Sequence, residues 1–344
     1  MLISNDAGTG TLDAASNNTG FGNEVFDDLT SGDDNTGVGA QALAKLTTGG
    51  ENTAVGSAAL DACTTGSYNS AVGRNSLGAL TTGGENVAMG YHSLDANTTG
   101  TGNTALGGSS LGANTTASYN TGIGYNALAG NETATGCTAV GSYSLDANNS
   151  GNNNTAVGHN ALGANSTGTQ NTAVGAEALD ANTTGDQNSA LGLSALGANT
   201  TGQDNVAIGR AALAANTTAD NNVAVGSGAL VANTTGHSNV GIGHLALNTN
   251  TTQANNTAVG FRALVANSTG SENQALGTYA LTANTTGSNN VAMGYNALGD
   301  NTTASDNTAV GFRALQSNTT GTNNTAFGMS TLMVNTTAID NTAI

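Results

Sequence analysis

The chain has 344 residues, of which 50 are Gly and none is Pro or Trp, and only 3% are aromatic and 8% charged. Such a chain cannot fill the thick core of an ordinary globular domain, because Leu is its largest common apolar residue, so the core must be narrow. The formal net charge of −17, from 22 acidic and 5 basic residues, argues against nucleic acid or anionic membranes as partners, because both require clusters of Lys and Arg.

The first segment, residues 1–17, fits the pattern of the rest of the chain poorly, although Leu12 matches it. We predict a divergent N-terminal coil that acts as a cap or docking surface. The segment lacks the basic and apolar blocks of a signal peptide. We therefore expect either export by another route or a chain that is part of a longer product. No stretch is long and apolar enough for a transmembrane helix, so we expect no membrane insertion.

Residues 18–340 repeat with a period of 17, and residues 341–344 begin a further, partial coil. We number the positions of each repeat as slots 1 to 17, starting from the Asn of each "NTAVG"-like segment. Slot 5 is Gly in all 19 coils from Gly22 to Gly328, and slot 9 is Leu from Leu43 to Leu332. Slot 4 is always apolar. A disordered linker has no reason to keep apolar residues at fixed intervals, so we predict a repeat fold.

Seventeen residues are too few for a helical repeat, whereas "TAV" and "NAL" are typical of short strands with alternating side chains. The predicted fold is all-β: a parallel β-solenoid of about twenty stacked coils, which at roughly 4.8 Å per coil gives a rod of about 95 Å. The slot 5 glycines would form a corner at positive φ, which other residues avoid. The representative corner glycines are Gly56, Gly73, Gly90, Gly175 and Gly260.

Substitutions along the repeat indicate which slots face inward. We expect slots 4 and 9 to form the core ladder, represented by Val55, Leu60, Val174, Leu179, Val259 and Leu264. Slot 12 is Asn from Asn97 to Asn335 but Leu or Cys in earlier coils. An inward Asn ladder with stacked amides explains that exchange. We place Asn97, Asn114, Asn182 and Asn233 in it.

Slot 3 is Ala or Gly throughout, and slot 8 is mostly Ala or Ser. Alternation would point them away from slots 4 and 9, and a solvated surface would drift to larger polar residues. Two interpretations remain open: a cramped corner, or a lateral contact with another copy of the chain. The candidate contact residues are Ala54, Ala59, Ala173 and Ala178.

Several motifs suggest chemistry but have simpler explanations. "NTT" matches the N-glycosylation sequon at Asn97 and many other positions, but a glycan on every coil would not fit, so a structural turn is favoured. The slot 10 carboxylates, such as Asp61 and Asp95, lie two coils apart, too regularly for a glycosidase acid and base. The four His residues lack ligand partners, and Cys63 and Cys137 are too distant for a disulfide. We expect no catalytic, cofactor-binding or metal-binding residues.

Slots 6 and 7 collect most large and basic side chains into one longitudinal stripe. The stripe is either a tolerant solvent edge or a surface that contacts a partner or glycan. Its best candidates for partner contact are Tyr91, Tyr125, Phe261, Arg262, Phe312 and Arg313.

The "NTAVG…AL…NTTG" pattern of residues 18–344 resembles the repeats of phage-type tail-fibre-domain proteins. It is more distantly similar to the head repeats of trimeric autotransporter adhesins. That resemblance implies an extracellular, cell-surface or virion-surface fibre, and a trimer by analogy. The chain stops four residues into a coil, and exposed strand edges recruit other strands. This favours head-to-tail stacking into filaments.

We therefore expect a structural, non-enzymatic extracellular fibre or stalk that associates with itself, head-to-tail or laterally, and needs no cofactor. The first alternative is a tail-fibre or adhesin shaft that recognises surface glycans through slots 6 and 7. The second is an ice-binding protein with Thr rows at slots 2, 13 and 14, although Val87, Val206, Gln274 and Val291 interrupt slot 2.

Overall fold

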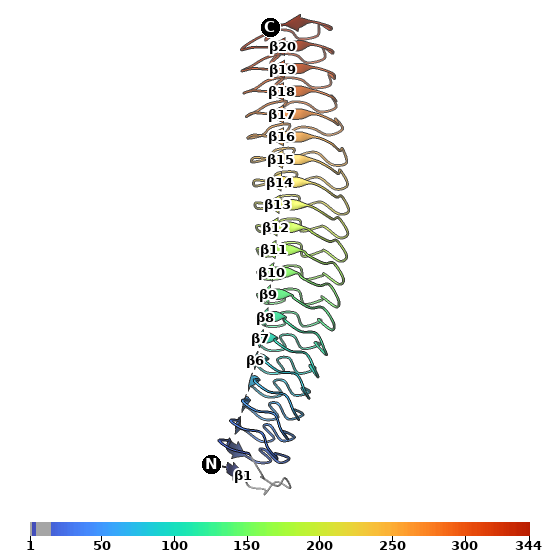
Figure 1. Ribbon diagram of the computed structural model, residues 1–344. Coiled ribbons are helices and arrows are strands. Elements are labelled where there is room, and N and C mark those ends of the chain that lie inside the picture. The colour runs from blue at the N-terminus through green and yellow to red at the C-terminus, as the bar shows by residue number, and fades with distance from the viewer. Residues whose placement is uncertain (1, 5–14) are drawn as a thin grey trace. The chain divides into compact units, whose positions relative to one another are not determined.

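The computed structural model describes residues 2–4 and 15–344 and contains two compact units, Met1–Asn171 and Thr172–Ile344. Each unit is a parallel β-solenoid, as predicted, and the described residues contain no helix. Every coil places one short strand beside the strands of the neighbouring coils in its unit (Figure 1). Most of the N-terminal coil predicted over residues 1–17, including Leu12, lies outside the described residues.

The strands are two to four residues long and recur once per repeat. In the first unit they are β1 (Leu2–Ser4), β2 (Thr19–Gly22), β3 (Thr36–Val38), β4 (Thr53–Val55), β5 (Ser70–Val72), β6 (Val87–Met89), β7 (Thr104–Leu106), β8 (Thr121–Ile123), β9 (Thr138–Val140) and β10 (Thr155–Val157). In the second unit they are β11 (Thr172–Val174), β12 (Ser189–Leu191), β13 (Val206–Ile208), β14 (Val223–Val225), β15 (Val240–Ile242), β16 (Thr257–Val259), β17 (Gln274–Leu276), β18 (Val291–Met293), β19 (Thr308–Val310), β20 (Thr325–Phe327) and β21 (Thr342–Ala343).

The strand register follows the repeat. Ala54 of β4 pairs with Ala71 of β5, 17 residues further on, and the same spacing holds from β2 to β10 and from β11 to β21. The first pairing departs from it, since Leu2 of β1 faces Gly20 of β2. Each slot therefore forms a row of equivalent side chains along its unit.

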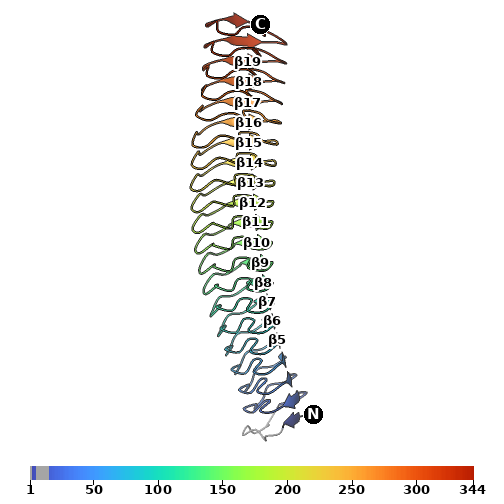
Figure 2. The same cartoon turned by 180° about the vertical axis from the view of Figure 1, so that it is seen from behind.

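Only slots 2 to 4 form a strand, so the prediction of a second strand at "NAL" was wrong. Slots 6 to 11 are turns, in which slots 7 and 9 adopt the left-handed conformation, as in Ala58 (φ 55°) and Leu60 (φ 53°). The turn backbone is nevertheless paired: the Ala58 N–H donates to Ala40 O of the preceding coil, and the Leu60 N–H donates to Ser76 O of the next. These bonds repay the cost of a left-handed non-Gly residue. Figure 2 shows the turns stacked behind the strands within each unit.

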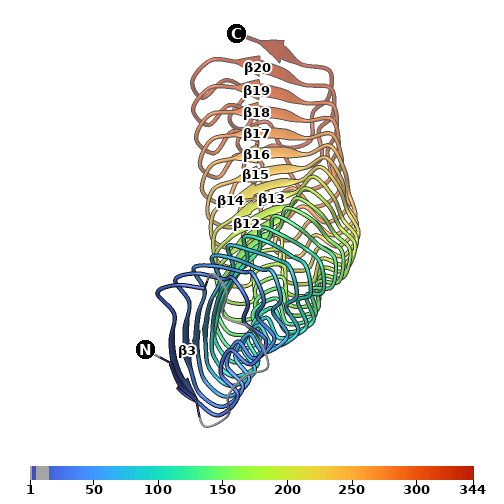
Figure 3. The same ribbon diagram turned by 60° about the horizontal axis from the view of Figure 1, so that its bottom comes forward.

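The core lies between slot 3 of the strand and slots 8, 9 and 12 of the rest of the coil. Figure 3 shows the looped path of successive coils within each unit. Leu60, Leu179 and Leu264 are fully buried. A Cβ added at Gly122 in slot 3 would lie 3.3 Å from Leu111 Cγ in slot 9, so the interior is one side chain across. Slot 3 stays small because the slot 9 Leu fills the space opposite it.

The prediction that slot 4 faces the core was wrong. Val55 is 37% exposed, and Val174 and Val259 are half-buried. Alternation along the strand turns slot 3 inward and slots 2 and 4 outward. Slot 9 belongs to a left-handed turn rather than to a strand, so its inward direction says nothing about slot 4.

The proposed lateral contact through slots 3 and 8 was wrong for the same reason. Its candidates Ala54, Ala59, Ala173 and Ala178 are all fully buried in the chain's own core. They are small because the core is narrow. This is nearer to the alternative of a cramped corner, although the crowded place is the interior of the coil.

Slot 12 forms a ladder of buried amides, in which Asn97, Asn114, Asn182 and Asn233 are fully buried. Asn97 closes its own turn, because its Nδ2 donates to Gly100 O at 3.0 Å and its Oδ1 accepts from the Gly100 N–H at 3.0 Å. Asn114 Nδ2 then donates to Asn97 Oδ1 of the preceding coil. A second buried ladder runs through slot 1, where Asn52 Nδ2 donates to Asn35 Oδ1.

The slot 5 glycines have two reasons to be invariant. Gly56, Gly73, Gly90, Gly175 and Gly260 have φ between 132° and 142°, a region that L-residues rarely adopt. The coils also approach closely there: a Cβ on Gly73 would lie 2.4 Å from Gly90 O. The predicted positive φ is therefore present, together with a close approach that the sequence did not reveal.

Candidate interaction surfaces

The outward face of each sheet carries two rows of mostly β-branched or apolar side chains, at slots 2 and 4, which we call the sheet face. Slot 4 varies among Val, Ile, Leu, Met and Phe, and neither slot holds a charged residue from Thr19 to Phe327. The side chains of the sheet face are exposed or half-buried, and Met89 is 52% and Phe327 56% exposed. Monomeric soluble proteins rarely expose apolar patches larger than a few hundred Å². The sheet face is therefore a candidate surface for association.

The stripe at slots 6 and 7 is exposed, as expected, and includes Tyr91, Tyr125, Phe261, Arg262, Phe312 and Arg313. In the second unit five rings on consecutive coils form a continuous ladder. Their successive centroid separations are 5.6, 5.5, 6.1 and 5.4 Å, through His244, Phe261, Tyr279, Tyr295 and Phe312. Arg313 lies 5.1 Å from the Phe312 ring centroid.

The stacked rings therefore stabilise the coils that carry them. Aromatic pairs at these separations contribute roughly 0.5–1.5 kcal/mol each beyond area burial. The first unit holds a shorter run, Tyr125 to Tyr143 at 5.5 Å and Tyr143 to His159 at 6.3 Å.

Several slot 10 carboxylates are partly buried. Partial burial raises the pKa of Asp61, although the positive charge of Lys45 opposes the shift. Burial also raises the pKa of Asp146 and of Asp180. Asp61 and Asp95 are separated by an intervening coil that has Gly78 at slot 10.

The structure corrects one detail about the His residues, because His92 Nδ1 contacts Asp95 Oδ2 three residues along the same turn. The contact is a pair rather than a cluster: no group of three or more His, Cys, Asp or Glu residues suited to a metal ion occurs among residues 2–4 and 15–344.

Both thiols are buried and unpaired. Burial raises the pKa of Cys63 to about 11 and also raises the pKa of Cys137. A thiol with a raised pKa is protonated at neutral pH and a poor nucleophile.

The Thr rows are only partly available to solvent. Slot 13 hydroxyls donate to the backbone of the next coil, as Thr47 Oγ1 does to Thr64 O at 2.9 Å. Slot 14 hydroxyls, such as those of Thr65 and Thr82, are exposed. Within the folded chain the sequon Asn97 is fully buried with its amide nitrogen hydrogen-bonded, which agrees with a structural turn.

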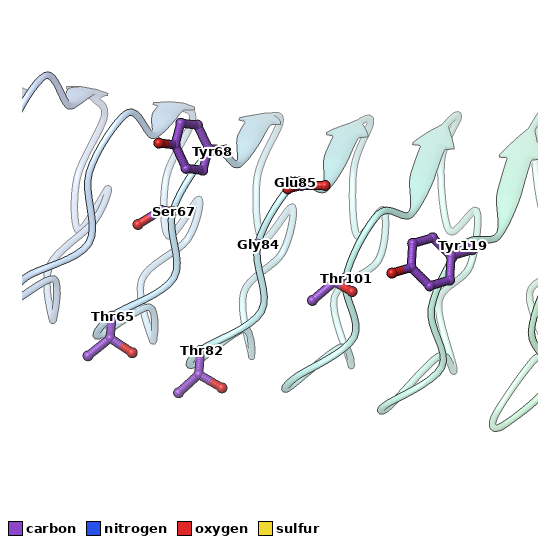
Figure 4. Close-up of a pocket in the computed structure, with 8 residues that line it drawn as sticks. All are labelled: Thr65, Ser67, Tyr68, Thr82, Gly84, Glu85, Thr101 and Tyr119. Atoms are coloured by element: carbon purple, nitrogen blue, oxygen red, sulfur yellow. The ribbon is translucent and has the colours of Figure 1, made fainter.

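A groove that the sequence analysis missed lies along slots 14 to 17 of the first unit, with a volume of about 330 Å³. Tyr68 and Tyr119 stand at its two ends, with Glu85 between them on the same side of the coils (Figure 4). Thr65 and Thr82, three residues before Tyr68 and Glu85 in the same coils, also line the groove. The sequence contains a signal for this groove, since Tyr68 and Tyr119 are the only aromatic residues at slot 17.

Comparison with known proteins assigns no family to the chain: no protein-family model matches it, and no curated protein matches it. In the part of the chain that the structure describes, no helix is long and apolar enough to cross a bilayer.

Proposed function

We propose that this chain is a structural, non-enzymatic fibre or stalk protein whose copies associate side by side through the sheet face. The observation that carries the proposal is the uncharged, exposed double row at slots 2 and 4. Acidic and basic residues lie on the other faces of the coil, at slots 6, 7, 10, 11, 13, 16 and 17 in the regular repeats from residue 35 onward. They keep those faces solvated and leave the sheet face as the adhesive one.

The area available matches what association requires. Complete burial of one Val, Leu, Ile or Met side chain removes roughly 60–120 Å² of apolar surface from water. Two rows of side chains that are roughly half exposed then offer about 60–120 Å² per coil. The nine strands from β2 to β10 would present on the order of 500–1,100 Å², a range that includes the ~800 Å² per partner of a stable interface.

A charge placed in slot 4 tests the proposal. We expect the purified chain to sediment as an oligomer. Val55→Lys together with Val157→Lys should shift it to monomer, because each ammonium would be desolvated in the interface. The matched control is Ala147→Lys at slot 11, where the chain itself has Lys45 in another coil. An unaltered chain that sediments as a monomer at all concentrations would overturn the proposal, as would a double variant that still assembles.

A second function is favoured by the aromatic ladder: a tail-fibre or adhesin shaft that recognises surface glycans through slots 6 and 7. Phe261, Tyr295 and Phe312 are all more than 40% exposed. Exposed rings on successive coils provide stacking platforms with a polar edge. Binding of the second unit's ladder to a glycan array, lost in Phe261→Ser with Phe312→Ser, would support this function. Ser occupies slot 6 in Ser57, Ser142 and Ser227.

An extracellular, cell-surface or virion-surface location is part of the proposal. Its support is the resemblance of the repeats to those of tail-fibre and adhesin-head proteins. Labelling intact cells or particles with a membrane-impermeant amine reagent, followed by recovery of modified Lys45, tests it. Labelling that occurs only after lysis would contradict it.

A further inference from the structure

The groove between Tyr68 and Tyr119 carries an inference that rests on neither the sheet face nor the slot 6 and 7 stripe. We propose that it is a binding site for a short neutral oligosaccharide, about three sugars long, lying along the stack of coils.

The first argument is that the two tyrosines depart from the rest of their slot. Slot 17 is left-handed, with φ of 64° at Tyr68 and 62° at Tyr119. In every other coil from Asp34 to Asp340 the slot holds Asp, Glu, Asn, Gln, Ser or Gly, and short polar residues and Gly suit this conformation best. Slots 7 and 9 carry larger side chains in the same conformation, so the departure at slot 17 lies in the aromatic rings and not in the backbone.

Both tyrosine rings are exposed. Tyr68 is 58% exposed and Tyr119 is 71% exposed. Neither ring takes part in an aromatic pair within the described residues. Exposed aromatic rings offer faces on which a ligand can stack, so two of them at the ends of one groove indicate a ligand.

The second argument is the shape of the groove. Tyr68, Glu85, Gly102 and Tyr119 occupy slot 17 in four successive coils. Gly102 leaves the slot open, and the Tyr119 ring lies over it, with Tyr119 Cδ1 only 2.9 Å from where a Cβ would be. Gly84 likewise has no side chain on the wall beside Glu85. Three coil steps of roughly 4.8 Å separate the two tyrosines, which gives about 14 Å. That distance suits about three pyranose rings in an extended chain.

The third argument is the chemistry of the walls. The groove has no aliphatic wall for an apolar ligand, since Thr, Ser, Gly and Glu line the space between the rings. A pyranose presents C–H groups on its faces and hydroxyls at its edge. The electronegative face of a Tyr ring attracts those C–H groups, and the Glu85 carboxylate and the Thr65 and Thr82 hydroxyls face the remaining space as hydrogen-bonding groups. The single formal charge among the lining residues is negative, so acidic sugars are excluded and neutral ones accepted.

The test is binding of four neutral trisaccharides, cellotriose, chitotriose, maltotriose and mannotriose, to the intact chain by titration calorimetry. We expect at least one to bind, and its monosaccharide to bind at least tenfold more weakly because it reaches only one ring. Tyr68→Asn and Tyr119→Asn should each weaken binding at least tenfold. Asn occupies slot 17 in Asn153, Asn221 and Asn255 and suits positive φ, so both variants should fold and melt no lower than the unaltered chain.

Matched controls locate the site. Tyr125→Ser removes an exposed Tyr from slot 6 of the same unit and should leave binding unchanged. Glu85→Gln should weaken binding severalfold while keeping the hydrogen-bonding shape. The proposal is overturned if no trisaccharide binds, if binding survives both slot 17 substitutions, or if Tyr125→Ser abolishes it. A groove that instead binds a cationic tripeptide, with an affinity lost in high salt, would also overturn it.

Discussion

Cys137 interrupts the buried slot 1 ladder, so Cys137→Asn should stabilise the first unit. In most regular coils the slot 1 N–H and Nδ2 both donate to the Oδ1 of the preceding coil, as Asn52 does to Asn35 at 3.0 and 3.1 Å. Cys137 keeps only the bond from its own N–H to Asn120 Oδ1. Its Sγ donates to Gly151 O at 3.2 Å, and it offers Asn154 no amide oxygen.

The substitution adds two bonds: one from the new amide to Asn120 Oδ1, and one from the Asn154 N–H to the new amide oxygen. The Asn154 Nδ2 already donates to Gly151 O and Gly168 O, so it adds none. The new amide can also take over the thiol's bond to Gly151 O, as Asn52 Nδ2 bonds Gly66 O. At about 1 kcal/mol net per bond, the first unit should gain roughly 2 kcal/mol. For a unit of 171 residues this raises the melting temperature by about 4–8 °C. Steric fit is assured, because slot 1 is Asn in every other coil from Asn18 to Asn341.

Thermal melting and hydrogen exchange measure the effect. The melting temperature reports the gain, and exchange of the peptide that contains Asn154 reports whether its N–H has found an acceptor. Cys137→Ala is the matched control, since it removes the thiol without adding an amide, and it should be neutral or slightly destabilising. The ladder argument is refuted if Cys137→Asn melts no higher than Cys137→Ala, or if exchange at Asn154 does not slow.

Three further predictions concern the corner, the carboxylates and the thiols. Gly73→Ala should lower the free energy of unfolding of the first unit by about 3 kcal/mol or more, because the new Cβ would lie 2.4 Å from Gly90 O at a φ of 132°. Gly78→Ala in the same coil is the control, since its nearest contact would be at 3.4 Å. In denaturant titrations it should change the free energy of unfolding by less than about 0.5 kcal/mol. Burial raises the pKa of Asp61, Asp146 and Asp180 above 3.8 in the folded chain. The native state therefore binds these protons more readily than the unfolded chain, and the free energy of unfolding should fall as pH rises through the window above 3.8. In thermal melts from pH 3 to 7, the triple Asp→Asn variant should show a shallower fall, and an equal slope would contradict this cause. Cys63, with its pKa raised to about 11, should react with a thiol reagent at pH 8 only after unfolding, and rapid labelling of the native chain would show that the coil opens there.

The repeat predicted the fold well because its strongest constraints are periodic. A fixed spacing of 17 without insertions allows only equivalent coils, and Gly at slot 5 in every coil marks a backbone requirement. The exchange of Asn97 and its equivalents with Leu46, Cys63 and Leu80 correctly indicated a buried slot, since only an inward position accepts both an apolar side chain and a satisfied amide.

The directions of slots 4, 3 and 8 could not be read in the same way. Hydrophobicity suggested that Val55 is buried and Ala54 exposed, and the structure reverses both. In a core one side chain wide, Leu60 takes the available volume and only Ala fits opposite it. The sequence did not show that Leu60 is left-handed. This conformation turns slot 9 inward without any strand alternation.

Cryo electron microscopy of the purified chain over a concentration series tests most directly whether copies associate through the sheet face. The account predicts particles in which two or more copies lie side by side, with Val55, Val157 and their equivalents in the interface between them. Particles one copy wide at every concentration, with the sheet face in contact with solvent, would contradict it.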